Sequence, residues 1–108
     1  MRFISDLYLS EGMKGRERKI VQELKLGAGL MGVYCIAVPL FGSDPLEIIN
    51  AAFLKQRWFR KSDLLIVGFA GSLVEAELLS SEILSDIHDK QGNYDTRSYF
   101  NLVSEGGS

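Results

Sequence analysis

The chain has 108 residues, of which 46% are hydrophobic and 24% charged, and its formal net charge is −2. This apolar content excludes a disordered chain, and the length suits one domain with one core. A single cysteine, Cys35, excludes a framework of internal disulfides. We expect a cytoplasmic protein, because the first residues lack the apolar run of a signal peptide and no stretch resembles a membrane span.

The charges are divided unevenly along the chain. Residues 1–62 contain ten Lys/Arg and six Asp/Glu, a net charge of +4, whereas residues 63–108 contain two and eight, a net charge of −6. Such opposed charges predict pairing within the fold or between copies of the chain. They argue only weakly for nucleic-acid binding, because the acidic part would repel the same phosphates.

The first part of the chain is predicted to form a strand and then a helix. Residues 3–9 are typical of an edge strand or an extended lead-in. Ser10 is a candidate N-cap, and apolar residues at helical spacing continue to about Leu26. Gly27 then supplies the left-handed residue that commonly ends a helix.

Two continuous apolar runs, at 33–40 and 64–70, are predicted to be neighbouring strands. Runs of this kind are typical of strands that are covered on both faces. Between them, Asp44 and Pro45 match the N-cap and the first position of a helix, which we expect to continue to about Arg57.

The last part of the chain is predicted to be helical. A long helix should begin after Ser72 and end at Gly92, and Asp95 is a candidate cap for a final short helical turn. Strands alternating with helical stretches imply right-handed crossovers. We therefore expect an α/β fold in which helices pack around a small parallel sheet of two to three strands. It should form a single layered domain over 1–104, with a disordered tail at 105–108.

The turns that follow the two apolar runs contain candidate ligand-binding residues. In a parallel sheet both turns would lie at the carboxyl edge, where α/β folds bind their ligands. Backbone amides at such turns can hold a phosphate or a carboxylate. The predicted site is formed by Ser43, Asn50, Gly71 and Ser72. The simpler alternative is that glycine and serine are common in tight turns between a strand and a helix.

A basic and aromatic segment, Arg57-Trp58-Phe59-Arg60, is a candidate interface. Its two rings could anchor a loop or a second subunit. Aromatic rings flanked by cations can also stack on bases, so nucleic-acid binding is an alternative interpretation.

No catalytic or cofactor-binding set emerges from the remaining residues. Gly27, Gly29 and Gly32 form G-x-G-x-x-G, but a helix precedes them and a strand follows, which is the reverse of the dinucleotide-binding context. His88 is the only histidine, so a His-based metal site within the chain is not expected. Cys35 lies in an apolar run, where a thiol is an ordinary buried side chain. We therefore expect neither a metal nor a cofactor.

Three segments resemble a group of small bacterial cytosolic α/β proteins with no assigned activity. They are residues 6–12 (Asp-Leu-Tyr-Leu-Ser-Glu-Gly), 65–71 (Leu-Ile-Val-Gly-Phe-Ala-Gly) and 95–100 (Asp-Thr-Arg-Ser-Tyr-Phe). The resemblance implies a free-standing domain and transfers no catalytic residue.

Together these patterns favour a small non-catalytic intracellular module that self-associates or binds a protein partner. We expect a homo-oligomer, most simply a dimer, and no membrane partner. Binding of a small anionic ligand at the predicted turns is the second hypothesis, and nucleic-acid binding is the third.

Overall fold

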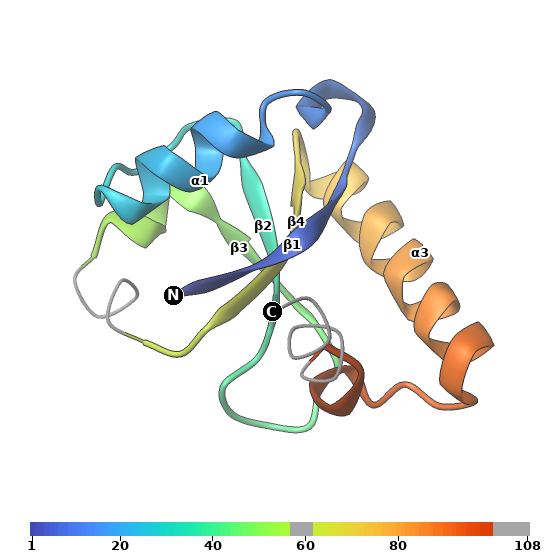
Figure 1. Ribbon diagram of the computed structural model, residues 1–108. Coiled ribbons are helices and arrows are strands. Elements are labelled where there is room, and N and C mark those ends of the chain that lie inside the picture. The colour runs from blue at the N-terminus through green and yellow to red at the C-terminus, as the bar shows by residue number, and fades with distance from the viewer. Residues whose placement is uncertain (57–61, 101–108) are drawn as a thin grey trace.

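A four-stranded mixed sheet lies at the centre of the molecule, with helices on both of its faces (Figure 1). The computed structural model describes residues 1–56 and 62–100. The strands are β1 (Arg2–Leu9), β2 (Tyr34–Val38), β3 (Glu47–Asn50) and β4 (Leu65–Ala70), in the order β1-β4-β2-β3. The helices are η1 (Glu11–Met13), α1 (Glu17–Lys25), η2 (Ala51–Lys55) and α3 (Leu73–Gln91), where η marks a 3-10 helix. A last helical turn covers 96–100.

The predicted parallel sheet of two to three strands is wrong. The two apolar runs do lie side by side as β2 and β4, but they are antiparallel, with Tyr34 opposite Ala70 and Val38 opposite Leu65. Among the hydrogen-bonded neighbours, β1 and β4 form the one parallel pair. The physical reason is the additional strand β3 between the two runs. β3 pairs antiparallel with β2 on one side, and the chain passes through η2 and then enters β4, on the other side of β2, in the same direction as β3.

The helix predicted over 44–57 is also wrong, because β3 and η2 occupy most of this segment. Leu46 and Ile48 pack on the α3 side of the sheet, and Ile49 packs on the α1 side. This alternation has the period of a strand. Asp44 and Pro45 lie in the loop that precedes β3 and not in the first turn of a helix.

The other predicted helices and strands that fall within the described residues are confirmed with small changes, whereas the predicted tail at 105–108 lies outside these residues. Residues 3–9 belong to β1, which lies at an edge of the sheet. The helix predicted after Ser10 is divided into η1 and α1. The break includes Gly15, where φ is 85°. Ser72 caps α3, which ends at Gly92 in the left-handed conformation. Asp95 caps the last turn by accepting a hydrogen bond from the Ser98 amide at 3.2 Å.

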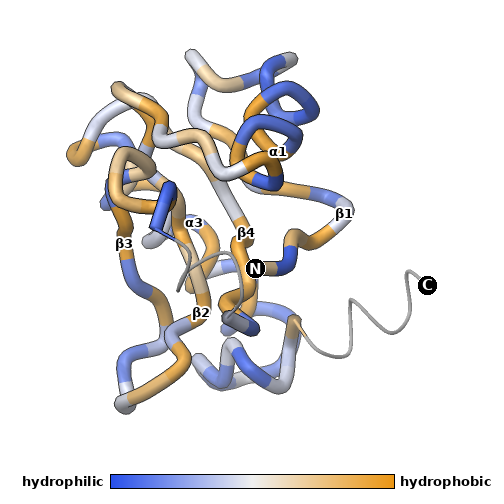
Figure 2. The backbone as a smooth tube through the Cα atoms, turned by 90° about the vertical axis from the view of Figure 1, so that its left-hand side faces the viewer, coloured by the Kyte–Doolittle hydropathy of each residue, from blue (hydrophilic) through white to orange (hydrophobic). Residues whose placement is uncertain are grey.

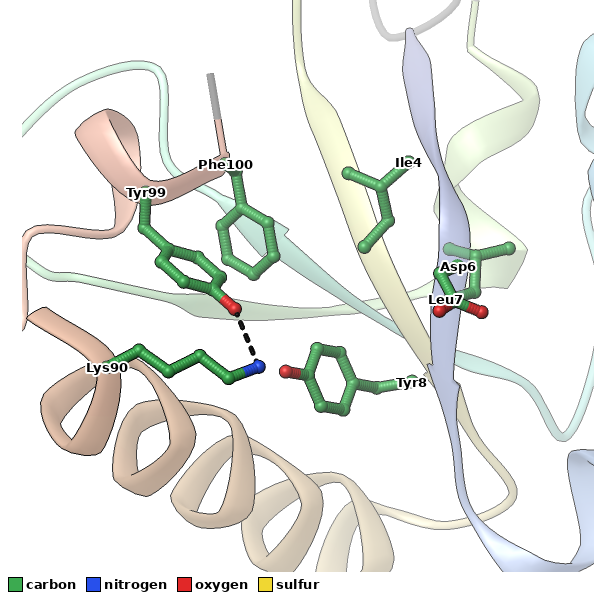
Figure 3. Close-up of a pocket in the computed structure, with 7 residues that line it drawn as sticks. All are labelled: Ile4, Asp6, Leu7, Tyr8, Lys90, Tyr99 and Phe100. Carbon is green, nitrogen blue, oxygen red and sulfur yellow. Dashed lines mark hydrogen bonds between the residues drawn. The ribbon is translucent and has the colours of Figure 1, made fainter. Parts of the chain in front are cut away.

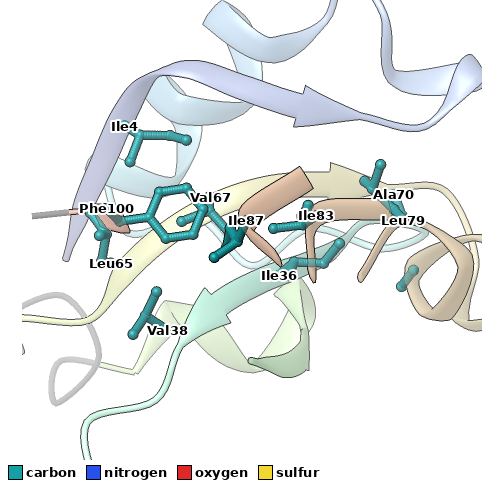
Figure 4. Close-up of a cluster of buried hydrophobic side chains, with 11 residues drawn as sticks. Ile4, Ile36, Val38, Leu65, Val67, Ala70, Leu79, Ile83, Ile87 and Phe100 are labelled. Carbon is teal, nitrogen blue, oxygen red and sulfur yellow. The ribbon is translucent and has the colours of Figure 1, made fainter. Parts of the chain in front are cut away.

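The core consists of two apolar layers, one on each face of the sheet. α3 covers one layer, which Figure 4 shows around Ile36, Val67 and Ile83. α1 covers the other, in which Leu24 and Phe69 are fully buried. In Figure 2 the central strands are largely orange, whereas α1 has long blue stretches. The uninterrupted apolar runs in β2 and β4 thus reflect the burial of both faces of these strands under helices. This burial occurs in a mixed sheet as well as in the predicted parallel sheet.

β1 does not follow β4 evenly. Phe3 pairs with Ile66, but the next paired residue, Tyr8, lies opposite Gly68. Residues 4–7 therefore face only Val67, and β1 bulges away from the sheet. This bulge leaves a space between β1 and the C-terminal end of α3.

Candidate functional site

The structure does not bring the predicted ligand-binding residues together. Because β2 and β4 are antiparallel, the loop after β2 and the turn after β4 lie at opposite ends of the sheet. Ser43 is exposed in the first of these, whereas Gly71 and Ser72 follow β4. Asn50 lies at the same end as Ser72, but on the far side of β2. The shared carboxyl edge on which the predicted site depended does not exist.

Three of these residues have local structural roles. The Ser72 hydroxyl accepts a hydrogen bond from the Glu75 amide at 3.2 Å and caps α3. The side-chain oxygen Oδ1 of Asn50 accepts a hydrogen bond from the Ala52 backbone amide at 3.0 Å and thereby caps η2. The Gly71 amide donates to the Ser10 hydroxyl at 3.2 Å. Turn and cap formation thus accounts for these residue types. The predicted interface residues Arg57, Trp58, Phe59 and Arg60 lie outside the described residues.

A pocket of about 440 Å³ lies beside the bulge of β1 (Figure 3). It opens between β1, the C-terminal end of α3 and the last helical turn. Its lining residues are Ile4, Asp6, Leu7, Tyr8, Lys90, Tyr99 and Phe100. This volume is in the range of small-molecule sites. No local pattern in the sequence predicts the pocket, because its walls are far apart in the chain and meet only through the bulge.

Three polar side chains that line the pocket are hydrogen-bonded, Tyr8 to a residue outside the lining and Lys90 to Tyr99 within it. The Tyr8 hydroxyl donates to Asp86 at 3.0 Å, and the Lys90 ammonium donates to the Tyr99 hydroxyl at 3.2 Å. Partial burial is the main cause that raises the pKa of Tyr8 above its ordinary value, and the hydrogen bond to Asp86 raises this pKa further. The hydrogen bond to Tyr99 raises the pKa of Lys90. At neutral pH both groups therefore keep their protons, and neither is prepared to act as a base.

Other reactive side chains among the described residues are not assembled into a catalytic set. Burial raises the pKa of the Cys35 thiol to about 12, which disfavours the nucleophilic thiolate. His88 is exposed and stacks on Tyr94, with 4.8 Å between the ring centroids. Within 1–56 and 62–100, no group of three or more His, Cys, Asp or Glu side chains could hold a metal ion.

Surface charge is divided between the two faces of the molecule. Residues 14–25, which include α1, contain five Lys/Arg and two Glu, a net charge of +3. α3 contains five Asp/Glu and one Lys, a net charge of −4 with His88 neutral. Among the described residues the only ion pair joins Lys14 and Glu11 at 3.0 Å. The opposed charges therefore remain largely unpaired within the described part of the chain, and the sheet separates them (Figure 1).

None of the described helices is both long enough and apolar enough to cross a membrane. Comparison of the chain with protein-family models, with curated proteins and with solved structures finds no match in any of the three.

Proposed function

We propose that this chain is a small non-catalytic module that binds further copies of itself in the cytoplasm. The observation that carries the proposal is the outward side of α3. A helix that covers a sheet ordinarily presents polar side chains to water. Val74 and Leu78 instead lie one turn apart on the outward side of α3, with 66% and 65% of their surfaces exposed.

Adjacent exposed apolar side chains are typical of a surface that another protein covers. Burying both would favour association by about 1.5–3 kcal/mol per side chain if each were fully covered. A second copy is the occupant we propose, because a net charge of −2 produces little repulsion between copies. The single cysteine, buried and without a disulfide, supports a cytoplasmic setting.

Sedimentation equilibrium tests this proposal over a range from low to high micromolar concentrations. The average mass of the wild-type chain should rise with concentration. The double variant Val74→Gln/Leu78→Gln should weaken association at least about ten-fold, because a ten-fold change needs only about 1.4 kcal/mol.

Phe41→Gln is the matched control, because Phe41 is also an exposed apolar residue, 80% accessible, but lies in the loop after β2. Its association should equal that of the wild type. A wild-type chain that stays monomeric at every concentration would refute the proposal, and so would equal weakening by the Phe41 and α3 variants. Capture of a different protein by monomeric chain would also count against self-association.

A further inference from the structure

The charges next to the exposed apolar residues indicate how copies of the chain would be arranged. On the outward side of α3, Val74 and Leu78 lie among exposed carboxylates, of which Glu77 and Glu82 are the nearest in the helix. We call these four residues the acidic face. Residues three to four positions apart share one side of a helix, so apolar and acidic groups are presented together.

α1 presents a surface of the opposite kind. Ile20 and Leu24 are buried against the sheet, which turns Arg18 and Lys19 outward, and both are exposed. Leu26, at the C-terminal end of the helix, is 77% exposed. We call Arg18, Lys19 and Leu26 the basic face. Like the acidic face, it combines charged groups with an exposed apolar side chain.

The two faces lie on opposite sides of the sheet, as the alternation of buried residues shows. Cys35 and Ala37 of β2 point into the layer under α1, whereas Ile36 and Val38 point into the layer under α3. Figure 1 shows α1 and α3 on either side of the strands. No ion pair joins α1 to α3 among the described residues, so within that part of the chain neither face neutralises the other.

We propose that the basic face of one copy binds the acidic face of the next, in a head-to-tail arrangement. This inference rests on the proposed self-association and specifies its geometry. Pairing of two identical faces about a twofold axis would set like charges opposite each other, which is destabilising. A head-to-tail contact instead joins opposite charges, and it leaves one unused face at each end. Such contacts build open rows, or rings if the rotation between copies closes.

The experiment uses two full-length variants with reversed charges. The double variant Arg18→Glu/Lys19→Glu makes both faces acidic, and the double variant Glu77→Lys/Glu82→Lys makes both faces basic. Each variant alone should associate at least about ten-fold more weakly than the wild type, because every contact then joins like charges. An equimolar mixture should regain association, because each face again meets its opposite. The regained association should weaken as salt is added, because salt screens exposed charges.

Asp44→Lys is the control, because it reverses a charge that belongs to neither face. Asp44 is exposed in the loop after β2. It should associate like the wild type. Circular dichroism should show that every variant is folded, as expected for substitutions at exposed positions.

The outcomes separate this inference from the proposed function. If the wild type associates and the α1 variant associates equally well, the contact does not use the basic face and the head-to-tail arrangement is refuted, while self-association stands. Failure of the mixture to regain association refutes it in the same way. A monomeric wild type refutes both.

Discussion

Replacing Gly68 with alanine should separate β1 from β4. Gly68 lies in β4 opposite Tyr8, where the irregular part of β1 rejoins the sheet. A Cβ atom at this position would lie 2.9 Å from the Tyr8 backbone oxygen and 3.3 Å from the Tyr8 Cβ. The closest atom belongs to the backbone, so the strand itself must move. Such overpacking costs about 1–3 kcal/mol.

Urea denaturation measures this cost, and thermal unfolding provides a second readout. For a domain of about this size, each kcal/mol should lower the midpoint temperature by about 4–8 °C. Amide hydrogen exchange should become faster in β1 than in β2, because the displaced strand is the one that opens.

Gly71→Ala is the matched control. Its added Cβ would lie 3.0 Å from Glu75 Oε2 and 3.5 Å from Met13 Cε, and both are ends of side chains that can rotate away. We expect its stability to lie within about 0.5 kcal/mol of the wild type. Wild-type stability of Gly68→Ala, or equal losses of stability in the two variants, would show that the close approach of Tyr8 does not require glycine at position 68.

Two further predictions concern the cap of α3 and the buried thiol. Ser72→Ala should cost about 1 kcal/mol in urea denaturation, because the Glu75 amide loses its acceptor. Ser81→Ala, on the exposed side of the same helix, should be neutral, and equal costs would contradict the capping role. The pKa of Cys35 is raised from 9.0 to about 12 in the folded chain, so the folded state binds more protons than the unfolded state between these values. Stability should therefore fall as pH rises from about 9 to about 12, and it should fall less in Cys35→Ala; an identical decline in both chains would contradict this reasoning.

The sequence predicts elements well where local and tertiary signals agree. Every residue of β4 is buried, which matches its continuous apolar run. α3 has a capping serine and a terminating glycine at the predicted positions, and packing against the sheet reinforces both.

The failures occur where a local signal competes with packing. Asp44 and Pro45 favour a helix start, but Ile48 and Ile49 must enter opposite layers of the core, and only a strand places them there. Strand direction failed for a related reason: burial on both faces shows that a strand is covered, but not which way its neighbour runs.

The pocket and the two faces differ in how far the sequence could predict them. The hydrogen bond from Tyr8 to Asp86 joins residues 78 positions apart, and only the bulge of β1 opens a space beside it. No local pattern carries that information. The separation of charge, by contrast, is visible in the sequence, because α1 and α3 lie in parts of the chain with opposite net charge. What the sequence could not show is that the sheet keeps these charges apart.

The bulge of β1 also protects the molecule from an unwanted form of polymerisation. A sheet edge with a long, regular row of free backbone groups is a template on which another chain can add a strand. At one edge, β1 is interrupted across residues 4–7, and at the other, β3 has only four residues. Neither edge offers a long regular row, so crowded copies of this chain should resist amyloid-like growth.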